Sequence, residues 1–204
     1  MDPSGNTIVL RIIIIVILLA LSAYFSSAET ALTMVNKIRM RTLADDGNKA
    51  AACVLKLHEN KSKMLSAILI GNNVVNLSTS SIMTILAADI FGNAAVGIAT
   101  GVLTVLILIF GEITPKTFAT INNTKLALSY ASSIFLITKL LTPVVYIINK
   151  LSTAILIILR IDSKQSKRIM TERELRTIVD VSHEEGVIEE SEKDMLNNVF
   201  DFKQ

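Results

Sequence analysis

Three long apolar segments constrain the fold of this chain more than any other feature of its sequence. They cover about residues 8–30, 64–88 and 94–116, and each is long enough to cross a bilayer, which requires about 20 helical residues. Hydrophobic residues make up 51% of the chain and its mean hydropathy is +0.54, which together are too apolar for an ordinary soluble domain. The first segment follows Asp2 rather than a basic region, so it is not typical of a cleaved signal peptide. The sequence therefore predicts an all-α membrane protein with three transmembrane helices.

Basic residues predict how these segments are oriented. The polar loop at residues 36–63 carries the lysines and arginines Lys37, Arg39, Arg41, Lys49, Lys56, Lys61 and Lys63. The positive-inside rule places such a loop in the cytoplasm. We therefore expect a multi-pass protein of the cell membrane with its N-terminus outside, a short external turn at residues 89–93, and a cytoplasmic C-terminus.

The apolar stretch at residues 126–161 is harder to assign, because Lys139, Pro143, Asn149 and Lys150 interrupt it. A fourth crossing would put the following basic residues outside, against the charge rule. We expect two short juxtamembrane helices around Pro143, either re-entrant or lying along the cytoplasmic interface. A model with four spans remains the alternative, since the charge rule has exceptions.

The character of the chain changes after the predicted transmembrane domain, residues 1–162. Residues 163–204 are rich in acidic side chains and predict a cytoplasmic acidic helical bundle. Thr171 and Glu174 have the spacing of a capping box, and Gly186 is expected to end that helix before a second one at residues 189–200. No terminating signal follows, so we expect a further domain beyond this sequence.

Two of the predicted spans carry polar stripes. Ser22, Ser26 and Glu29 stand at positions i, i+4 and i+7 of the first span, and Asn72 and Asn76 share a face of the second. Serine and asparagine also join membrane helices by hydrogen bonds, worth about 0.6–2 kcal/mol each. Glu29 is better interpreted as a helix-end residue that reaches cytoplasmic water.

The third segment ends in a polar motif at residues 111–116. Pro115 cannot donate the helical hydrogen bond to the carbonyl of Gly111, which is expected to remain open beside the carboxylate of Glu112. An open carbonyl next to a carboxylate is a plausible half-site for a hard cation. The alternative is a simple helix end, with Lys116 as an interface anchor or as a counter-charge to Glu112.

Together these groups predict a metal site made of oxygen donors. Without His, Cys or Met ligands, such a site favours Mg²⁺, Ca²⁺ or Na⁺ over transition metals. The candidate metal-binding residues are Ser22, Ser26, Asn72, Asn76, Gly111 and Glu112.

Three segments of the chain resemble the signatures of a known family. They are SAYFSSAETA at 22–31, GNNVVN at 71–76 and GEITPKT at 111–117, and they look like the three motifs of the CNNM/CorC family of magnesium transporters, whose membrane domain is of the DUF21 type. Residues 171–190 resemble the acidic helical bundle that follows in that family. The resemblance covers nearly the whole chain.

The resemblance implies a homodimer with three spanning helices and a juxtamembrane helical belt in each subunit. It also implies export of Mg²⁺, which in several members is linked to Na⁺. Family members continue into CBS domains, which this sequence does not contain. The family's ion-site residues map onto the serines, the asparagines and the Gly-Glu pair already singled out.

We therefore expect a magnesium transporter that binds Mg²⁺ in a cytoplasm-facing intramembrane cavity and exports it, with Na⁺ as the candidate coupling ion. A carrier whose central site holds Na⁺ and a Mg²⁺-sensing membrane regulator without transport activity are the alternatives. An enzyme is not expected, because His58 and His183 lie in polar segments far from the cluster. Cys53 alone supplies no disulfide, and the basic residues lack the interleaved aromatics of a nucleic-acid-binding surface.

Overall fold

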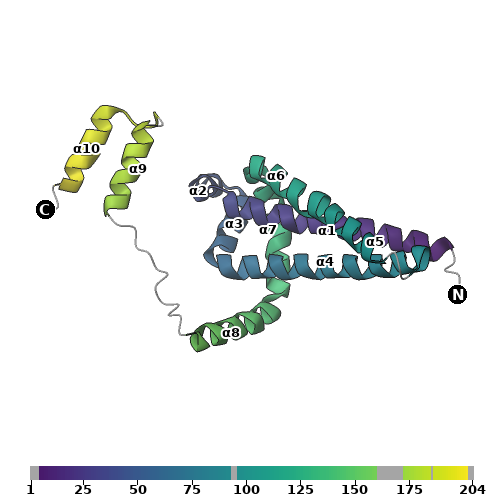
Figure 1. Ribbon diagram of the computed structural model, residues 1–204. Helices are drawn as coiled ribbons and strands as arrows, with labels where there is room; N and C mark the ends of the chain where they lie inside the picture. Colours follow the sequence, from purple (N-terminus) through teal and green to yellow (C-terminus); the bar gives the residue numbers. More distant parts are fainter. Residues whose placement is uncertain (1–4, 93–95, 160–171, 185, 202–204) are drawn as a thin grey trace. The chain divides into compact units, whose positions relative to one another are not determined.

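The computed structural model describes residues 5–92, 96–159, 172–184 and 186–201, and every regular element in these ranges is a helix (Figure 1). Residues 1–150 and 151–204 form two compact units, which are described separately below.

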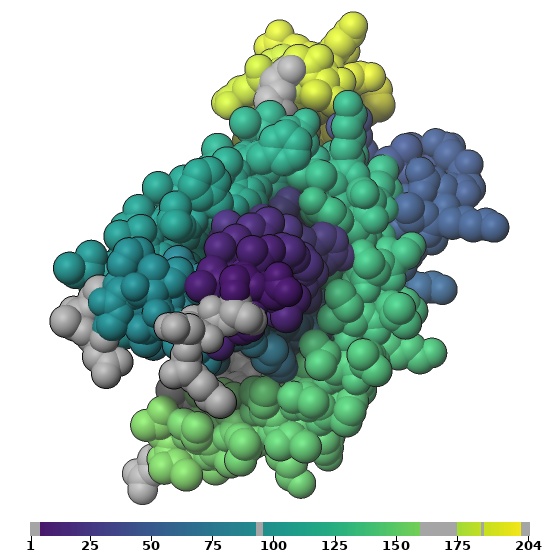
Figure 2. All heavy atoms as spheres, turned by 90° about the vertical axis from the view of Figure 1, so that its right-hand side faces the viewer, coloured from purple at the N-terminus to yellow at the C-terminus, as the bar shows by residue number. Residues whose placement is uncertain are grey.

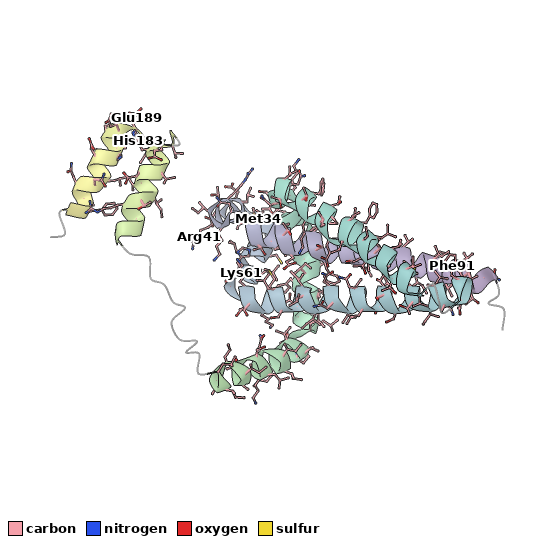
Figure 3. The ribbon with its side chains drawn as sticks, in the orientation of Figure 1. Met34, Arg41, Lys61, Phe91, His183 and Glu189 are labelled. Atoms are coloured by element: carbon pink, nitrogen blue, oxygen red, sulfur yellow. The ribbon has the colours of Figure 1, made fainter. Side chains whose placement is uncertain are left out.

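Three helical segments of the first unit are long and apolar enough to cross a membrane. They are α1 (Gly5–Met34), α4 (Lys61–Phe91) and a third span made of α5 (Val96–Leu106), the π-helix η2 (Ile107–Ile113) and α6 (Thr114–Ile121). Met34 and Lys61 lie at one end of the first two spans and Phe91 lies at the other, so α1 and α4 are antiparallel (Figure 3). The prediction of an all-α membrane protein with three candidate spans is confirmed.

Two predicted helix ends were wrong. The third span does not end at the polar motif, because the helix continues through η2 and α6 to Ile121. Asp89 lies within α4 rather than in a turn, and its carboxylate pairs with the guanidinium of Arg11 on α1. An ion pair between two spans lets a charged residue stay in the last turn of an apolar helix.

The helix α1 lies at the centre of the first unit. It contacts α4, η2, α6 and α7, and Figure 2 shows its N-terminal half between the teal atoms of the third span and the green atoms of α7. Its buried residues are small or apolar and all lie in its second half, from Ser22 to Leu32. Gly71 of α4 permits the closest approach, since a Cβ there would lie only 2.7 Å from the ring of Phe25. Small residues at such contacts are typical of helix packing in membranes.

The segment predicted as a polar loop contains two helices, α2 (Lys37–Asp45) and α3 (Lys49–Glu59). Asn36 caps α2, because its Oδ1 accepts hydrogen bonds from the amides of Ile38 and Arg39 at 2.8 and 3.2 Å. Asn48 caps α3 in the same way. Gly47 has a φ of +89°, a conformation that glycine adopts without a steric penalty, and it reverses the chain between the two helices. Asparagine caps therefore explain why this polar stretch is helical.

The interrupted apolar stretch forms α7 (Asn123–Leu140) and α8 (Thr142–Ile158), which are bent by 68° at Leu141. This agrees with the expected pair of helices next to Pro143. Counted as one broken span, the pair would be a fourth crossing, so the four-span alternative stays open.

The second unit contains the hairpin of α9 (Glu172–Glu184) and α10 (Glu190–Asp201). Gly186 has a φ of +73° at the turn, as expected for a residue that ends a helix. The ammonium group of Lys193 lies 2.9 Å from the carboxylate of Asp180, which joins the two helices. Thr171, the N-cap of the predicted capping box, lies outside the described residues, so the box itself is not tested.

The side chain of His58 joins α3 to the end of α1. Its Nε2 donates a hydrogen bond of 2.7 Å to the carbonyl of Leu32, one of the last carbonyls of α1, which have no partner within the helix. Burial lowers the pKa of His58 below its ordinary value of 6.5, and the charges of Lys37 and Lys61 lower it further, against the opposing effect of the Leu32 hydrogen bond. His58 therefore stabilises the fold in its neutral form.

Acidification is expected to destabilise the first unit through this histidine. Because the folded pKa lies below the unfolded value of 6.5, the unfolded chain binds more protons as the pH falls through 6.5, and stability decreases there. We expect the melting temperature of detergent-solubilised protein to fall more between pH 7.5 and 5.5 in the wild type than in His58→Gln, whose amide can still donate to Leu32. His183→Gln is the matched control and should behave as the wild type. Equal slopes in the wild type and His58→Gln would contradict the prediction.

Candidate cation site

The hydroxyl groups of Ser22 and Ser26 lie one turn apart on the same face of α1. Ser22 is 1% exposed and Ser26 is 0% exposed, although both are polar residues in an apolar helix. Their i, i+4 spacing aims both side chains at the surface that α1 shares with α4 and the third span. The predicted polar stripe of α1 is therefore buried between helices.

The amides of Asn72 and Asn76 meet Ser22 from α4. The Ser22 hydroxyl lies 2.7 Å from Oδ1 of Asn76 and 3.4 Å from Oδ1 of Asn72. The Nδ2 group of Asn76 donates a hydrogen bond of 3.3 Å to Oε1 of Glu112, which leaves its oxygen directed at Ser22. The span α4 thus contributes two amide oxygens around the Ser22 hydroxyl of α1.

The third span contributes backbone as well as side-chain oxygen. The Ser22 hydroxyl lies 3.5 Å from the carbonyl of Gly111, and the Ser26 hydroxyl lies 3.4 Å from the carbonyl of Glu112. Gly111 is buried, and a Cβ at this position would lie 2.9 Å from Oγ of Ser22. Only glycine allows the backbone of the third span to come this close to α1.

The widened turn of η2 presents these carbonyls. At its end the amide of Thr114 bonds to the carbonyl of Ile109, five residues back, instead of the usual four. Pro115, the next residue, has no amide hydrogen to offer to the carbonyls behind it. A π-helix followed by proline removes the regular i+4 partner of the Gly111 carbonyl, which is how backbone oxygen becomes available inside a membrane helix.

The resulting cluster has more acceptors than protons. The single hydroxyl hydrogen of Ser22 faces three oxygens, those of Asn72, Asn76 and Gly111, and it can satisfy only one of them well. The distances from the Ser22 oxygen to these atoms, 2.7–3.5 Å, bracket the spacing of about 2.9 Å between neighbouring ligands of an octahedral Mg²⁺ ion. A small cation could therefore satisfy these oxygens together.

The charge of Glu112 is not balanced by the neighbouring lysine. Lys116 pairs with Glu29 of α1 at 3.4 Å, so the predicted role of Lys116 as a counter-charge to Glu112 was wrong. Both side chains of this pair are more than a third exposed, which fits the interpretation of Glu29 as a residue at the edge of the span. Among the described residues Glu112 has no cationic partner, and its carboxylate remains available to a bound cation.

All six predicted site residues lie in this cluster: Ser22, Ser26, Asn72, Asn76, Gly111 and Glu112. Within the described ranges no group of three or more His, Cys, Asp and Glu side chains could hold a metal, so the cluster depends on neutral oxygens and one carboxylate. Asn73 points away from it and is exposed. The η2 turn was not predicted, although a proline just after an apolar helical run signals a disturbed ladder.

Other polar residues of the spans are satisfied locally. The hydroxyl of Thr79 is buried and donates a hydrogen bond of 2.8 Å to the carbonyl of Val75 on its own helix. The hydroxyl of Ser27 lies 3.3 Å from that of Tyr130 on α7 and joins the two helices. These residues have the bonding expected of structural polar groups, whereas the cluster around Ser22 does not.

The fold and the cluster define the class as a multi-pass membrane protein with a polar site buried between its spans. Residues 13–192 match the family described as the Cyclin M (CNNM) transmembrane N-terminal domain, and the chain belongs to this family. The predicted family is thereby confirmed.

Similar proteins occur in bacteria. The chain is 38% identical over 191 residues to a UPF0053 protein of Haemophilus influenzae, and 37% identical over 187 residues to the UPF0053 inner membrane protein YfjD of Escherichia coli. These alignments cover 94% and 90% of the chain but only 45% and 43% of the relatives. The chain is also 25% identical over 214 residues to the polyamine export protein of Escherichia coli. This alignment covers 94% of the chain and 46% of that protein. The chain thus spans less than half the length of these relatives.

A methyl group at Gly111 is expected to disturb the cluster. Gly111→Ala places a Cβ within 2.9 Å of the Ser22 hydroxyl and pushes it away from Asn76. Overpacking of this kind costs roughly 1–3 kcal/mol, so the affinity for Mg²⁺ should fall about tenfold or more in a calorimetric titration. Gly101→Ala is the control on the same span, because a Cβ there meets nothing within 4 Å. Equal affinities in the two variants would argue against Gly111 as part of the site.

Proposed function

We propose that this chain is the membrane domain of a magnesium transporter and that the cluster around Ser22 is where the ion binds. The observation that carries the proposal is the number of oxygen acceptors that share the buried Ser22 hydroxyl, beside a carboxylate that no described cation balances. A purely structural polar contact between helices would be expected to pair its donors and acceptors. A divalent cation would satisfy the oxygens and the charge together.

The donor set supports Mg²⁺ over softer metals. Hydroxyl, amide, carbonyl and carboxylate oxygens are the ligands of Mg²⁺, Ca²⁺ and Na⁺, and six such groups converge here. One carboxylate leaves a net positive charge on a bound divalent ion, which favours weak and reversible binding. Such binding suits an ion that has to leave the site again.

A polyamine is a less suitable cargo for this cluster. The similar protein named a polyamine export protein raises that possibility, but a polyamine carries several ammonium groups several ångströms apart. Each would need its own anionic partner, and in the described part of the chain no cluster of acidic residues surrounds Glu112. A single compact cation matches one carboxylate better.

The proposal extends to direction and assembly. The basic end of the spans, at α2 and α3, is assigned to the cytoplasm by the positive-inside rule, so the N-terminus lies outside and Mg²⁺ enters the site from within. Export would be coupled to entry of Na⁺, and the working unit would be a homodimer that carries CBS domains beyond this sequence. The apolar side chains exposed on α1 and the third span support a membrane environment or a subunit contact. A regulator that senses Mg²⁺ without moving it is the alternative.

Removing the charge of Glu112 is expected to abolish most of the binding. Glu112→Gln keeps the size of the side chain but removes the only carboxylate of the cluster, so we expect the affinity for Mg²⁺ to fall at least about 100-fold. Mg²⁺ flux in proteoliposomes, measured with and without a Na⁺ gradient, should fall to the level of protein-free vesicles.

The control for this variant is Glu59→Gln, which makes the same chemical change on the exposed surface of α3. It should retain the flux of the wild type. Unchanged flux in Glu112→Gln would refute the proposed site. Binding of Mg²⁺ without flux in the wild type would favour the regulator, and flux of a polyamine instead of Mg²⁺ would assign the site to a different cargo.

A further inference from the structure

A cavity lies away from the cation cluster, between α3, α4 and α7 of the first unit. Its volume is about 280 Å³, and none of the cluster residues lines it. Asn60, Lys63 and Met64 place it at the first turn of α4. Lys61 marks this end of the helix in Figure 3. This is the basic end of the spans, at the level where a membrane meets water.

Three lysines give the cavity a strongly positive lining. Lys56 comes from α3, Lys63 from α4 and Lys139 from α7. No carboxylate lines the cavity, and none of the three lysines makes an ion pair with a residue in the described ranges. Three elements far apart in sequence thus bring like charges together without a compensating group.

Thr138, one of the residues that line the cavity, has a buried hydroxyl without a partner among the described residues. The side chain of Thr138 is 8% exposed, and its Oγ1 has no hydrogen-bond partner among the described residues. Threonine side chains in helices usually donate to a carbonyl one turn back, as Thr142 does to the carbonyl of Thr138 at 2.9 Å. A buried polar atom left unpaired is unfavourable unless a ligand or water completes it.

The first turn of α4 adds further donors. Asn60 lines the cavity and stands at the N-cap of α4, but its side chain makes no capping hydrogen bond. The first amides of a helix have no partner within the helix and carry a partial positive charge. They form an anion-binding element when other groups complete the site, as the lysines and Thr138 do here.

The rest of the lining is apolar. Leu57 and Met64 are buried, and Phe135 is 41% exposed. A cavity lined by lysines and by apolar side chains suits an amphiphile, which carries an anionic group on an apolar body. Basic pockets between membrane helices are known to bind the headgroups of anionic lipids.

We propose that this cavity binds a phosphate group, held by Lys56, Lys63 and Lys139 with the hydroxyl of Thr138 as a further donor. The position at the basic end of the spans and the apolar lining residues favour an anionic phospholipid as the source of that phosphate. A soluble phosphate compound shares the same chemistry and is distinguished by the experiment below.

The test compares two triple variants that remove the same charge. In one, Lys56, Lys63 and Lys139 are replaced by glutamine; in the other, the exposed lysines Lys49, Lys125 and Lys150, which do not line the cavity, are replaced. Native mass spectrometry of protein released from detergent measures retained dioleoylphosphatidylglycerol, with dioleoylphosphatidylcholine as the neutral lipid. We expect the first variant to retain at least about tenfold less dioleoylphosphatidylglycerol than the second.

Thr138→Val separates the cavity from general electrostatics, because it changes no charge and keeps the shape of the side chain. It should weaken retention of the anionic lipid severalfold while leaving the melting temperature of lipid-free protein unchanged or raised, since an unpaired hydroxyl is removed. A saturable rise of melting temperature with inorganic phosphate at constant ionic strength, without selective lipid retention, would assign the site to a soluble phosphate. Equal losses in both triple variants, or no loss in Thr138→Val, would overturn the proposal.

Discussion

The close approach of two helices to α1 is the constraint on which the rest of the membrane unit depends. Gly71 of α4 leaves room for the ring of Phe25, and Gly111 of the third span leaves room for the hydroxyl of Ser22. A Cβ at Gly71 would lie 2.7 Å from the ring of Phe25, and a Cβ at Gly111 would lie 2.9 Å from the Ser22 hydroxyl, so a side chain at either position would clash. With both glycines in place, oxygens from α4 and η2 come within 3.5 Å of the Ser22 hydroxyl of α1; larger residues would hold these spans apart.

The cluster differs from ordinary polar contacts between helices in its ratio of hydrogen-bond donors to acceptors. Thr79 and Ser27 also lie buried in the spans, and each has a partner that uses its hydroxyl. Ser22 instead faces three acceptors with one proton, and Glu112 shares only the amide of Asn76. In an apolar environment such a deficit of donors is costly, and it is tolerated where a ligand supplies the missing positive charge. The inference of a cation site therefore rests on donor stoichiometry rather than on polarity alone.

Periodicity was enough to predict the three spans and to place Ser22, Ser26, Asn72 and Asn76 on facing stripes, because the helical repeat fixes which side chains share a face. Periodicity alone could not predict that the stripes meet, since the partners lie about 50 residues apart in sequence; their shared oxygen chemistry and the family resemblance supplied that expectation. The helices α2 and α3 were missed because their polar composition concealed two asparagine caps. The π turn and the pairing of Lys116 with Glu29 depend on backbone register and on a neighbouring helix, which no local pattern determines.

The packing of α1 differs between its two halves, and this difference bears on how the spans could rearrange around the cluster. No side chain of α1 is buried from Gly5 to Leu21. From Ser22 onwards, most of the face toward α4 and α7 is buried. The cation cluster lies at the boundary between these halves. Toward Met34 the helix is held by a continuous core and by the hydrogen bond from His58 to Leu32. Toward the N-terminus fewer contacts oppose a shift of the spans, so a rearrangement that exposes the cluster to the opposite side would meet less resistance there.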